Sequence, residues 1–149
     1  MGQKKSQRLT TLKKLAQWKE QDAASAFNQQ RLRLQSEQQQ LKDLESYYRD
    51  YLQTIARQTQ VAREDLLNYR NFCQQLAQTI DQGELRVVTL EKELEIKKNQ
   101  WLVSRNKRKA LDEMIIRCRQ QEDQTTLAKE QKDSEEVWLG HRHRKSPTP

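Results

Sequence analysis

The chain has 149 residues, of which 33% are charged, 34% hydrophobic and 6% aromatic, and its formal net charge is +7. So few apolar side chains cannot fill a conventional packed core in a chain of this length, which favours a narrow interface between helices. No apolar run approaches the roughly 18 residues of a transmembrane helix and no signal-peptide segment is present, so we expect a cytoplasmic protein.

Residues that interrupt helices are scarce. Proline occurs only at positions 147 and 149, and the only glycine between Gln3 and Leu139 is Gly83. Proline and glycine are the strongest local breakers, so the chain is expected to be all-α with one weak point at Gly83. The expected parts are a basic disordered N-terminus (1–7), a coiled coil (8–139, with helices at about 8–57 and 63–139) and a basic disordered tail (140–149).

The first expected helix, 8–57, begins in a strongly positive segment. Residues 1–19 contain six Lys or Arg residues and no Asp or Glu. Apolar residues then recur with helical spacing, although Gln30 and Glu37 fall in the same row. Polar residues in such a row weaken a helix interface locally and help to fix its register. The row starts around Leu9 and Leu12, passes through the small residues Ala16, Ala23 and Ala26, and continues with Phe27, Leu34, Leu41, Leu44, Tyr48, Tyr51 and Ile55.

The second expected helix, 63–139, carries the clearest pattern. Its apolar residues alternate at intervals of three and four, and within 66–101 only Gly83 and Lys97 interrupt them. This period defines a seam, the row of a and d positions that packs against a partner helix in a left-handed coiled coil. The seam residues are Leu66, Tyr69, Cys73, Leu76, Ile80, Val87, Leu90, Leu94, Trp101, Leu111, Ile115 and Cys118.

The pattern leaves two architectures open. The apolar rhythm is lost between Ile55 and Leu66, which suits a turn, but this spacing of eleven residues also fits a stutter in one long dimerising helix. In a hairpin with a bend near residue 60, Arg8 would lie beside Asp112 and residues beyond about 113 would have no internal partner. We predict the hairpin: a monomeric, long antiparallel two-helix coiled coil with a C-terminal helical overhang.

The hairpin would stack two basic segments at its open end. Lys13, Lys14 and Lys19 would lie beside the run Lys98, Arg105, Lys107, Arg108 and Lys109. Like charges repel at short range, so an acidic partner surface would relieve this crowding. A solvated charged face and a basic coiled-coil arm that binds nucleic acid are the alternatives. No nucleic-acid module or aromatic stacking platform accompanies these charges, and we predict no nucleic-acid partner.

The sequence contains no pattern of residues that indicates a catalytic or metal-binding site. His141 and His143 are the only histidines and lie in the expected tail, while Cys73 and Cys118 stand singly at seam positions. There is no glycine-rich phosphate loop, and a pair of helices offers no concave pocket. We therefore expect neither enzymatic activity nor a cofactor or metal, and interpret both cysteines as small buried hydrophobic residues.

Aromatic residues lie just outside the seam on both helices. With Leu41 and Leu66 at position a, Tyr47 and Phe72 occupy g positions. Large residues at g either cover the seam or form a docking face. Together with neighbouring positions they form a stripe that comprises Gln40, Leu44, Tyr47, Tyr51, Phe72, Leu76, Thr79 and Gly83.

Three segments resemble the FliJ family of flagellar export proteins, in the same order and spacing: TLKKLAQWKEQDAA, QLKDLESYYRDYL and LLNYRNFCQQLAQTI. The resemblance implies an antiparallel two-helix coiled coil like the central stalk of a rotary ATPase. It also implies a non-enzymatic stalk in the cytoplasm, peripheral at the inner-membrane export apparatus. Its implied partners are the export ATPase ring, the cytoplasmic linker of the export-gate membrane protein and the export chaperones.

The resemblance also assigns roles to residues. The family's gate-contacting stripe falls on the eight stripe residues named above, where Thr79 and Gly83 are smaller or more polar than a contact surface favours. The basic end, defined as Lys13, Lys14, Lys107, Arg108 and Lys109, would face the ATPase ring. The related stalk proteins of virulence type III secretion are the alternative to a flagellar role.

Overall fold

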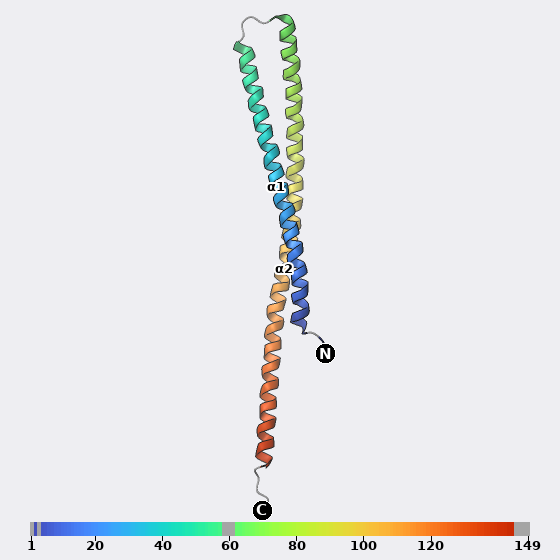
Figure 1. Cartoon of the computed structure of the whole chain (residues 1–149), viewed down its shortest axis with the longest axis vertical. Helices are drawn as coiled ribbons and strands as arrows, with labels where there is room; N and C mark the ends of the chain where they lie inside the picture. Colours follow the sequence, from blue (N-terminus) through green and yellow to red (C-terminus); the bar gives the residue numbers. More distant parts are fainter. Residues whose placement is uncertain (1, 3, 58–61, 145–149) are drawn as a thin grey trace, which may run out of the picture. The chain divides into compact units, whose positions relative to one another are not determined.

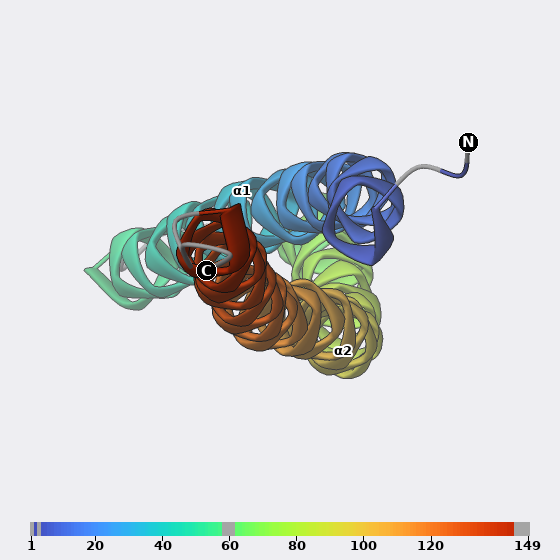
Figure 2. The same ribbon diagram turned by 90° about the horizontal axis from the view of Figure 1, so that it is seen from below.

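Two helices account for nearly all of the chain. The computed structural model describes residues 2, 4–57 and 62–144, with helix α1 at Lys5–Arg57 and helix α2 at Arg63–Arg144. Both ribbons are continuous (Figures 1 and 2), and no strand occurs among the described residues. The all-α prediction is confirmed. With almost no Gly or Pro inside the chain, little can stop a helix once it has been nucleated.

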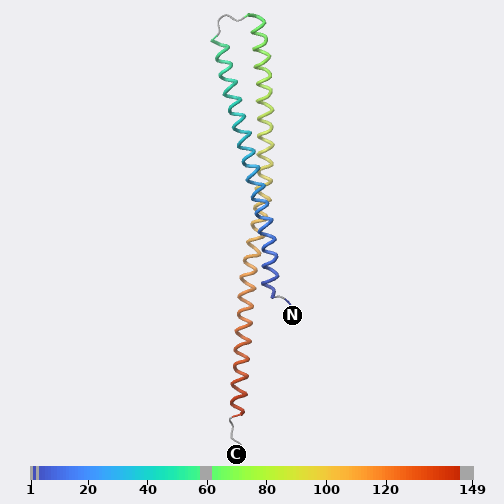
Figure 3. The backbone as a smooth tube through the Cα atoms, viewed as in Figure 1, coloured from blue at the N-terminus to red at the C-terminus, as the bar shows by residue number. Residues whose placement is uncertain are grey.

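The helices contribute to two compact units. Unit 1 comprises Met1–Lys19 and Ser104–Pro149, and unit 2 comprises Glu20–Val103. Each unit pairs a part of α1 with a part of α2, and the two parts run in opposite directions (Figure 3). The predicted antiparallel helical hairpin is thereby confirmed. The bend predicted near residue 60 falls on residues 58–61, which lie outside the described residues.

Unit 2 buries the seam that the heptad pattern predicts. Leu34 of α1 and Leu76, Ile80 and Leu90 of α2 are each at most 9% exposed, and every one is an a or d residue. Phe27 stacks on Trp101 with ring centroids 6.0 Å apart. Burial of such side chains at about 25 cal/mol per Å² is what holds two otherwise polar helices together.

Gly83 is a packing contact and does not interrupt α2. It lies within the helix and is buried, and no described residue has a positive φ. A Cβ at this position would lie 3.0 Å from Cδ1 of Leu41. The expectation of a weak point was therefore wrong. The missing side chain instead lets the two helices approach closely at a d position, which offsets the lower helix propensity of glycine.

In unit 2 the two helices separate toward the C-terminus of α1 and the N-terminus of α2. α1 and α2 diverge toward Arg57 and Arg63 (Figures 1 and 3), and Leu66 remains 53% exposed although it occupies an a position. The heptad pattern placed Leu66 in the core. A knob residue is buried only where the facing helix supplies a hole, and diverging helices do not supply one.

Unit 1 pairs the helices further along α2 than expected. Leu9 packs with Ile115 and Cys118, which are 5% and 8% exposed, and Lys13 rather than Arg8 lies beside Asp112. The prediction that pairing ends near residue 113 was wrong. Counting back from a bend ignores which apolar side chains meet, and burial of Leu9 against Ile115 fixes the register here.

The helices also extend beyond their expected ends. α1 begins at Lys5 rather than 8, and residues 140–144, expected to be disordered, form the last turn of α2. Four consecutive residues of that turn are His or Arg, which suits the negative end of the helix dipole. The guanidinium of Arg142 also lies over the Trp138 ring at 5.0 Å. Residues 145–149 of the expected tail lie outside the described residues.

The C-terminal overhang of α2 is confirmed, although it begins later than expected. Every residue from Asp123 to Arg144 is exposed, which shows that this stretch of unit 1 has no helix packed against it. Within the described part of the chain, no helix is both long and apolar enough to cross a membrane.

Candidate interaction surfaces

Four aromatic rings meet across the two helices of unit 2. Tyr47 and Tyr51 come from α1, and Tyr69 and Phe72 come from α2; we call these four residues the aromatic cluster. The ring of Tyr51 lies 4.8 Å from that of Phe72 and 5.7 Å from that of Tyr69, between centroids. Tyr47 meets Phe72 edge-on at 6.5 Å and stacks on Tyr51 at 6.3 Å. Edge-to-face pairs of this kind add about 0.5–1.5 kcal/mol each beyond area burial.

Position in the heptad decides which of these rings a partner could reach. Tyr51 and Tyr69 occupy d positions and are half-buried, whereas Tyr47 and Phe72 occupy g positions and remain 54% and 38% exposed. Burial and, secondarily, the nearby Cys73 raise the pKa of Tyr51 above its usual value. The cluster thus presents the exposed rings of Tyr47 and Phe72 beside two half-buried rings.

The remaining stripe residues divide into two groups. Leu76 and Gly83 are buried in the seam and Leu44 is half-buried, so they support the surface from within. Gln40 and Thr79 are exposed and line a shallow groove together with Leu44, Gly83 and Arg86. The Thr79 hydroxyl donates a hydrogen bond to the Gln75 carbonyl at 2.9 Å. Of the eight stripe residues, Gln40, Tyr47, Phe72 and Thr79 are exposed, and the other four are buried or half-buried.

A neighbouring groove was not predicted from the sequence. It has a volume of about 350 Å³ and lies where the seam opens, between Leu52 and Ile55 of α1 and Leu66, Tyr69, Arg70 and Cys73 of α2. The sequence signal was present in part, since Leu52 is apolar yet falls outside the seam. The pattern alone could not show that the helices diverge at this point.

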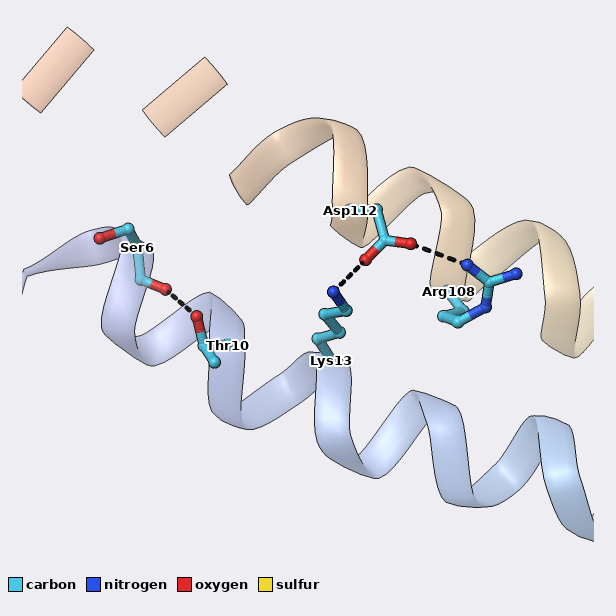
Figure 4. A network of polar contacts seen from close by, with 5 residues as sticks. All are labelled: Ser6, Thr10, Lys13, Arg108 and Asp112. Carbon is cyan, nitrogen blue, oxygen red and sulfur yellow. Dashed lines mark hydrogen bonds and ion pairs between the residues drawn. The ribbon is translucent and has the colours of Figure 1, made fainter. Parts of the chain in front are cut away.

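The basic end contains an internal ion-pair network. Asp112 Oδ1 lies 2.8 Å from the Lys13 ammonium, and Asp112 Oδ2 accepts a hydrogen bond of 2.7 Å from Arg108 (Figure 4). Lys13, and with it Arg108, holds the pKa of the Asp112 carboxyl below its usual value. Two of the five residues of the basic end therefore share one carboxylate, which cancels one of their two positive charges and partly relieves the predicted repulsion.

Lys14, Lys107 and Lys109 are the members of the basic end that take no part in this network. All three are exposed, and none pairs with a carboxylate among the described residues. They are the members of the basic end that remain available to a partner. Exposed ion pairs contribute roughly 0–1 kcal/mol, so these lysines would add specificity and association rate more than affinity.

The N-terminus of α1 is capped by α2. Glu122 accepts hydrogen bonds from the Ser6 amide at 3.2 Å and the Ser6 hydroxyl at 2.7 Å, and these bonds lower the pKa of the Glu122 carboxyl. The first turn of α1 has no acidic residue of its own. Thr10 donates to the Ser6 carbonyl, which ties the next turn to the same residue (Figure 4). A carboxylate at this position satisfies amides that have no helical partner and suits the helix dipole.

Metal chemistry finds no site in the described part of the chain. No group of three His, Cys, Asp or Glu residues gathers there, and both Cys73 and Cys118 are free thiols.

Comparison with known proteins identifies the family. No curated protein and no solved structure shows significant similarity to the chain. The family model described as "Flagellar FliJ protein" matches residues 4–146. Since this match covers nearly the whole chain, the chain belongs to the FliJ family, whose members serve the flagellar protein export apparatus.

Proposed function

We propose that the chain is a non-enzymatic stalk of the flagellar export apparatus, which links the export ATPase ring to the export gate and assists the cycling of export chaperones. The observation that carries the proposal is that some large or charged side chains pair the two helices while others remain exposed. The a and d residues are used for pairing the helices, while aromatic rings in unit 2 and lysines in unit 1 stay outside the seam. We place the stalk in the cytoplasm, peripheral to the inner membrane.

A seam of this kind suits a part that transmits force or asymmetry. Sliding one helix along the other would withdraw every a and d knob from its hole at once. Leu34, Leu76 and Leu90 illustrate this in unit 2, where each is at most 8% exposed. A partner that pushes on one helix would therefore move both.

The gate-binding face is assigned to the aromatic cluster and its neighbours in the stripe. Tyr47 and Phe72 are the expected anchors, because exposed aromatic residues held by rigid neighbours concentrate binding energy in a few positions. Gln40 and Thr79 would form a polar rim, and Leu44, Tyr51, Leu76 and Gly83 would hold the surface in shape from below.

The ATPase-binding face is assigned to the basic end. Lys14, Lys107 and Lys109 would make the contact, while Lys13 and Arg108 would stabilise the helix pair through Asp112. The family match supports a flagellar rather than a virulence secretion system. It likewise favours a protein partner over nucleic acid for the lysines.

The two faces can be tested separately in one binding experiment. Tyr47→Ala with Phe72→Ala should weaken binding to the gate linker by about 30-fold or more and leave ATPase binding unchanged. Lys14→Glu with Lys109→Glu should weaken ATPase binding in a salt-dependent way and leave gate binding unchanged. Lys42→Glu with Lys92→Glu, two exposed lysines of unit 2, is the matched control for charge. Failure of both surface variants to change either affinity would refute the stalk assignment.

A further inference from the structure

Unit 1 carries a groove that the heptad pattern did not reveal. It has a volume of about 240 Å³ and lies between Leu12, Leu15 and Lys19 of α1 and Lys107 and Leu111 of α2. We call it the lysine groove, because the two lysines are the only charged residues that line it. It lies beside the seam, whose local members are Leu9, Leu111, Ile115 and Cys118.

Three large apolar side chains beside this groove are exposed and lie outside the interface between the helices. Leu12, Leu15 and Trp18 are 51%, 47% and 66% exposed. Their spacing of three residues places them along one side of α1, outside the a and d row. Single exposed apolar residues are ordinary on protein surfaces, but a row of three next to a groove is typical of a binding surface.

The charges of the groove are uncompensated. Lys19 and Lys107 enter it from opposite helices, and neither pairs with a carboxylate among the described residues. Lys13 and Arg108 lie immediately beside it in the seam and share Asp112. Two like charges that face one apolar slot repel each other, and a carboxylate placed between them would be attracted by both.

We propose that the lysine groove binds an acidic amphipathic helix of a partner protein. Apolar side chains of that helix would fill the space between Leu12, Leu15 and Leu111, and its carboxylates would meet Lys19 and Lys107 at the rims. A helix fits because a groove between two helices accepts the apolar face of a third, whereas the described residues include no strand to whose edge an extended peptide could add. The inference deepens the proposed ATPase contact and rests on it for the identity of the partner.

The first test uses the full chain and the export ATPase. Leu12→Ser with Leu15→Ser should weaken ATPase binding at least tenfold, because two anchors are lost from the groove. Leu32→Ser with Leu85→Ser changes two leucines of unit 2 that are 53% and 69% exposed, and should leave the affinity unchanged. Circular dichroism should show equal helix content in both variants, since all four leucines lie largely outside the core.

The second test uses two designed helical peptides with the same leucine positions, one flanked by Glu and the other by Lys. The unaltered chain should bind the Glu peptide about tenfold more tightly than the Lys peptide. Lys19→Glu with Lys107→Glu should reverse this preference. Trp18 provides the readout, since in a Trp101→Phe, Trp138→Phe background its emission should shift to shorter wavelength on binding. Equal binding of both peptides, or no binding of either, would overturn the proposal. Displacement of the Glu peptide by vesicles of anionic lipid would also overturn it.

The two tests separate this inference from the proposed function. If Lys14→Glu with Lys109→Glu weakens ATPase binding while the Leu12 and Leu15 variant binds both the ATPase and the Glu peptide normally, the lysine groove is refuted and the stalk proposal stands. If the Leu12 and Leu15 variant loses the Glu peptide but binds the ATPase normally, the groove is supported as a helix-binding site and the ATPase is excluded as its partner.

Discussion

The core of unit 1 and the aromatic cluster of unit 2 both follow the heptad pattern, but their large side chains differ in exposure. In unit 1 the seam is closed around Leu9, Ile115 and Cys118, which are each at most 8% exposed. In unit 2 the aromatic cluster adjoins an open seam, and Tyr47 and Phe72 remain 54% and 38% exposed. Large side chains inside a closed seam stabilise the fold, whereas equally large ones at its margin remain available to a partner.

The largest expected effect tests the closed seam. Ile115→Ala should lower the free energy of unfolding by about 2–4 kcal/mol, because the side chain is 5% exposed and its loss leaves a cavity beside Leu9 and Cys118. Ile116→Ala removes the same atoms from a residue that is 56% exposed, and should cost less than about 1 kcal/mol. Chemical denaturation of both variants measures the difference, and similar costs would show that the seam of unit 1 is not closed.

The next effect concerns the polar part of the same seam. Asp112→Asn would leave Lys13 and Arg108 facing each other without a carboxylate, at a cost of about 1–3 kcal/mol. Glu113→Gln breaks the pair with Arg117, whose side chains are 69% and 71% exposed, and should cost roughly 0–0.5 kcal/mol. A thermal denaturation series compares them.

The pH dependence should follow from the same carboxylate. Because the folded protein lowers the pKa of Asp112, its contribution to stability is complete above the ordinary value of 3.8 and is lost as the pH falls through the lower folded value. Glu122, whose pKa is lowered from 4.5 by Ser6, acts in the same direction. Asp112→Asn should reduce the loss of unfolding free energy as the pH falls below about 4. An unchanged pH dependence would show that Asp112 does not stabilise the fold through its charge.

A smaller effect on stability is expected at the open seam. Tyr47→Ala and Phe72→Ala should each cost about 1 kcal/mol, because both side chains are already partly in water and lose mainly ring contacts. The double variant should keep a melting temperature close to that of the unaltered chain, although its binding to the gate linker is expected to be weak. A collapse of the melting curve in the double variant would show that these rings are core residues and that the stripe is no docking face.

The smallest effect distinguishes two helical glycines. Gly140→Ala should stabilise α2 locally by up to about 1 kcal/mol, because nothing lies within 4 Å of the new methyl group. Gly83→Ala should gain less, since its Cβ would lie 3.0 Å from Cδ1 of Leu41 and that side chain must shift. Equal gains at both sites would mean that the helices do not approach closely at Gly83.

Part of each candidate surface could be predicted from the sequence. The g positions of Tyr47 and Phe72 and the run Lys107, Arg108 and Lys109 follow from heptad counting alone. The division of the basic end could not be predicted in this way, since it depends on Asp112 lying between Lys13 and Arg108. Nor could the lysine groove, because Leu12 and Leu111 are separated by about a hundred residues of sequence and meet only in space.

The sequence by itself determined the helices and the identity of the seam. Helix formation and the seven-residue period depend on neighbours within a few residues, and the a and d rows can be read directly from the chain. The tertiary structure decided the pairing register, the point where the seam opens and the role of Gly83. Those depend on which distant side chains meet, and neither Leu9 on Ile115 nor Gly83 on Leu41 is encoded in any local pattern.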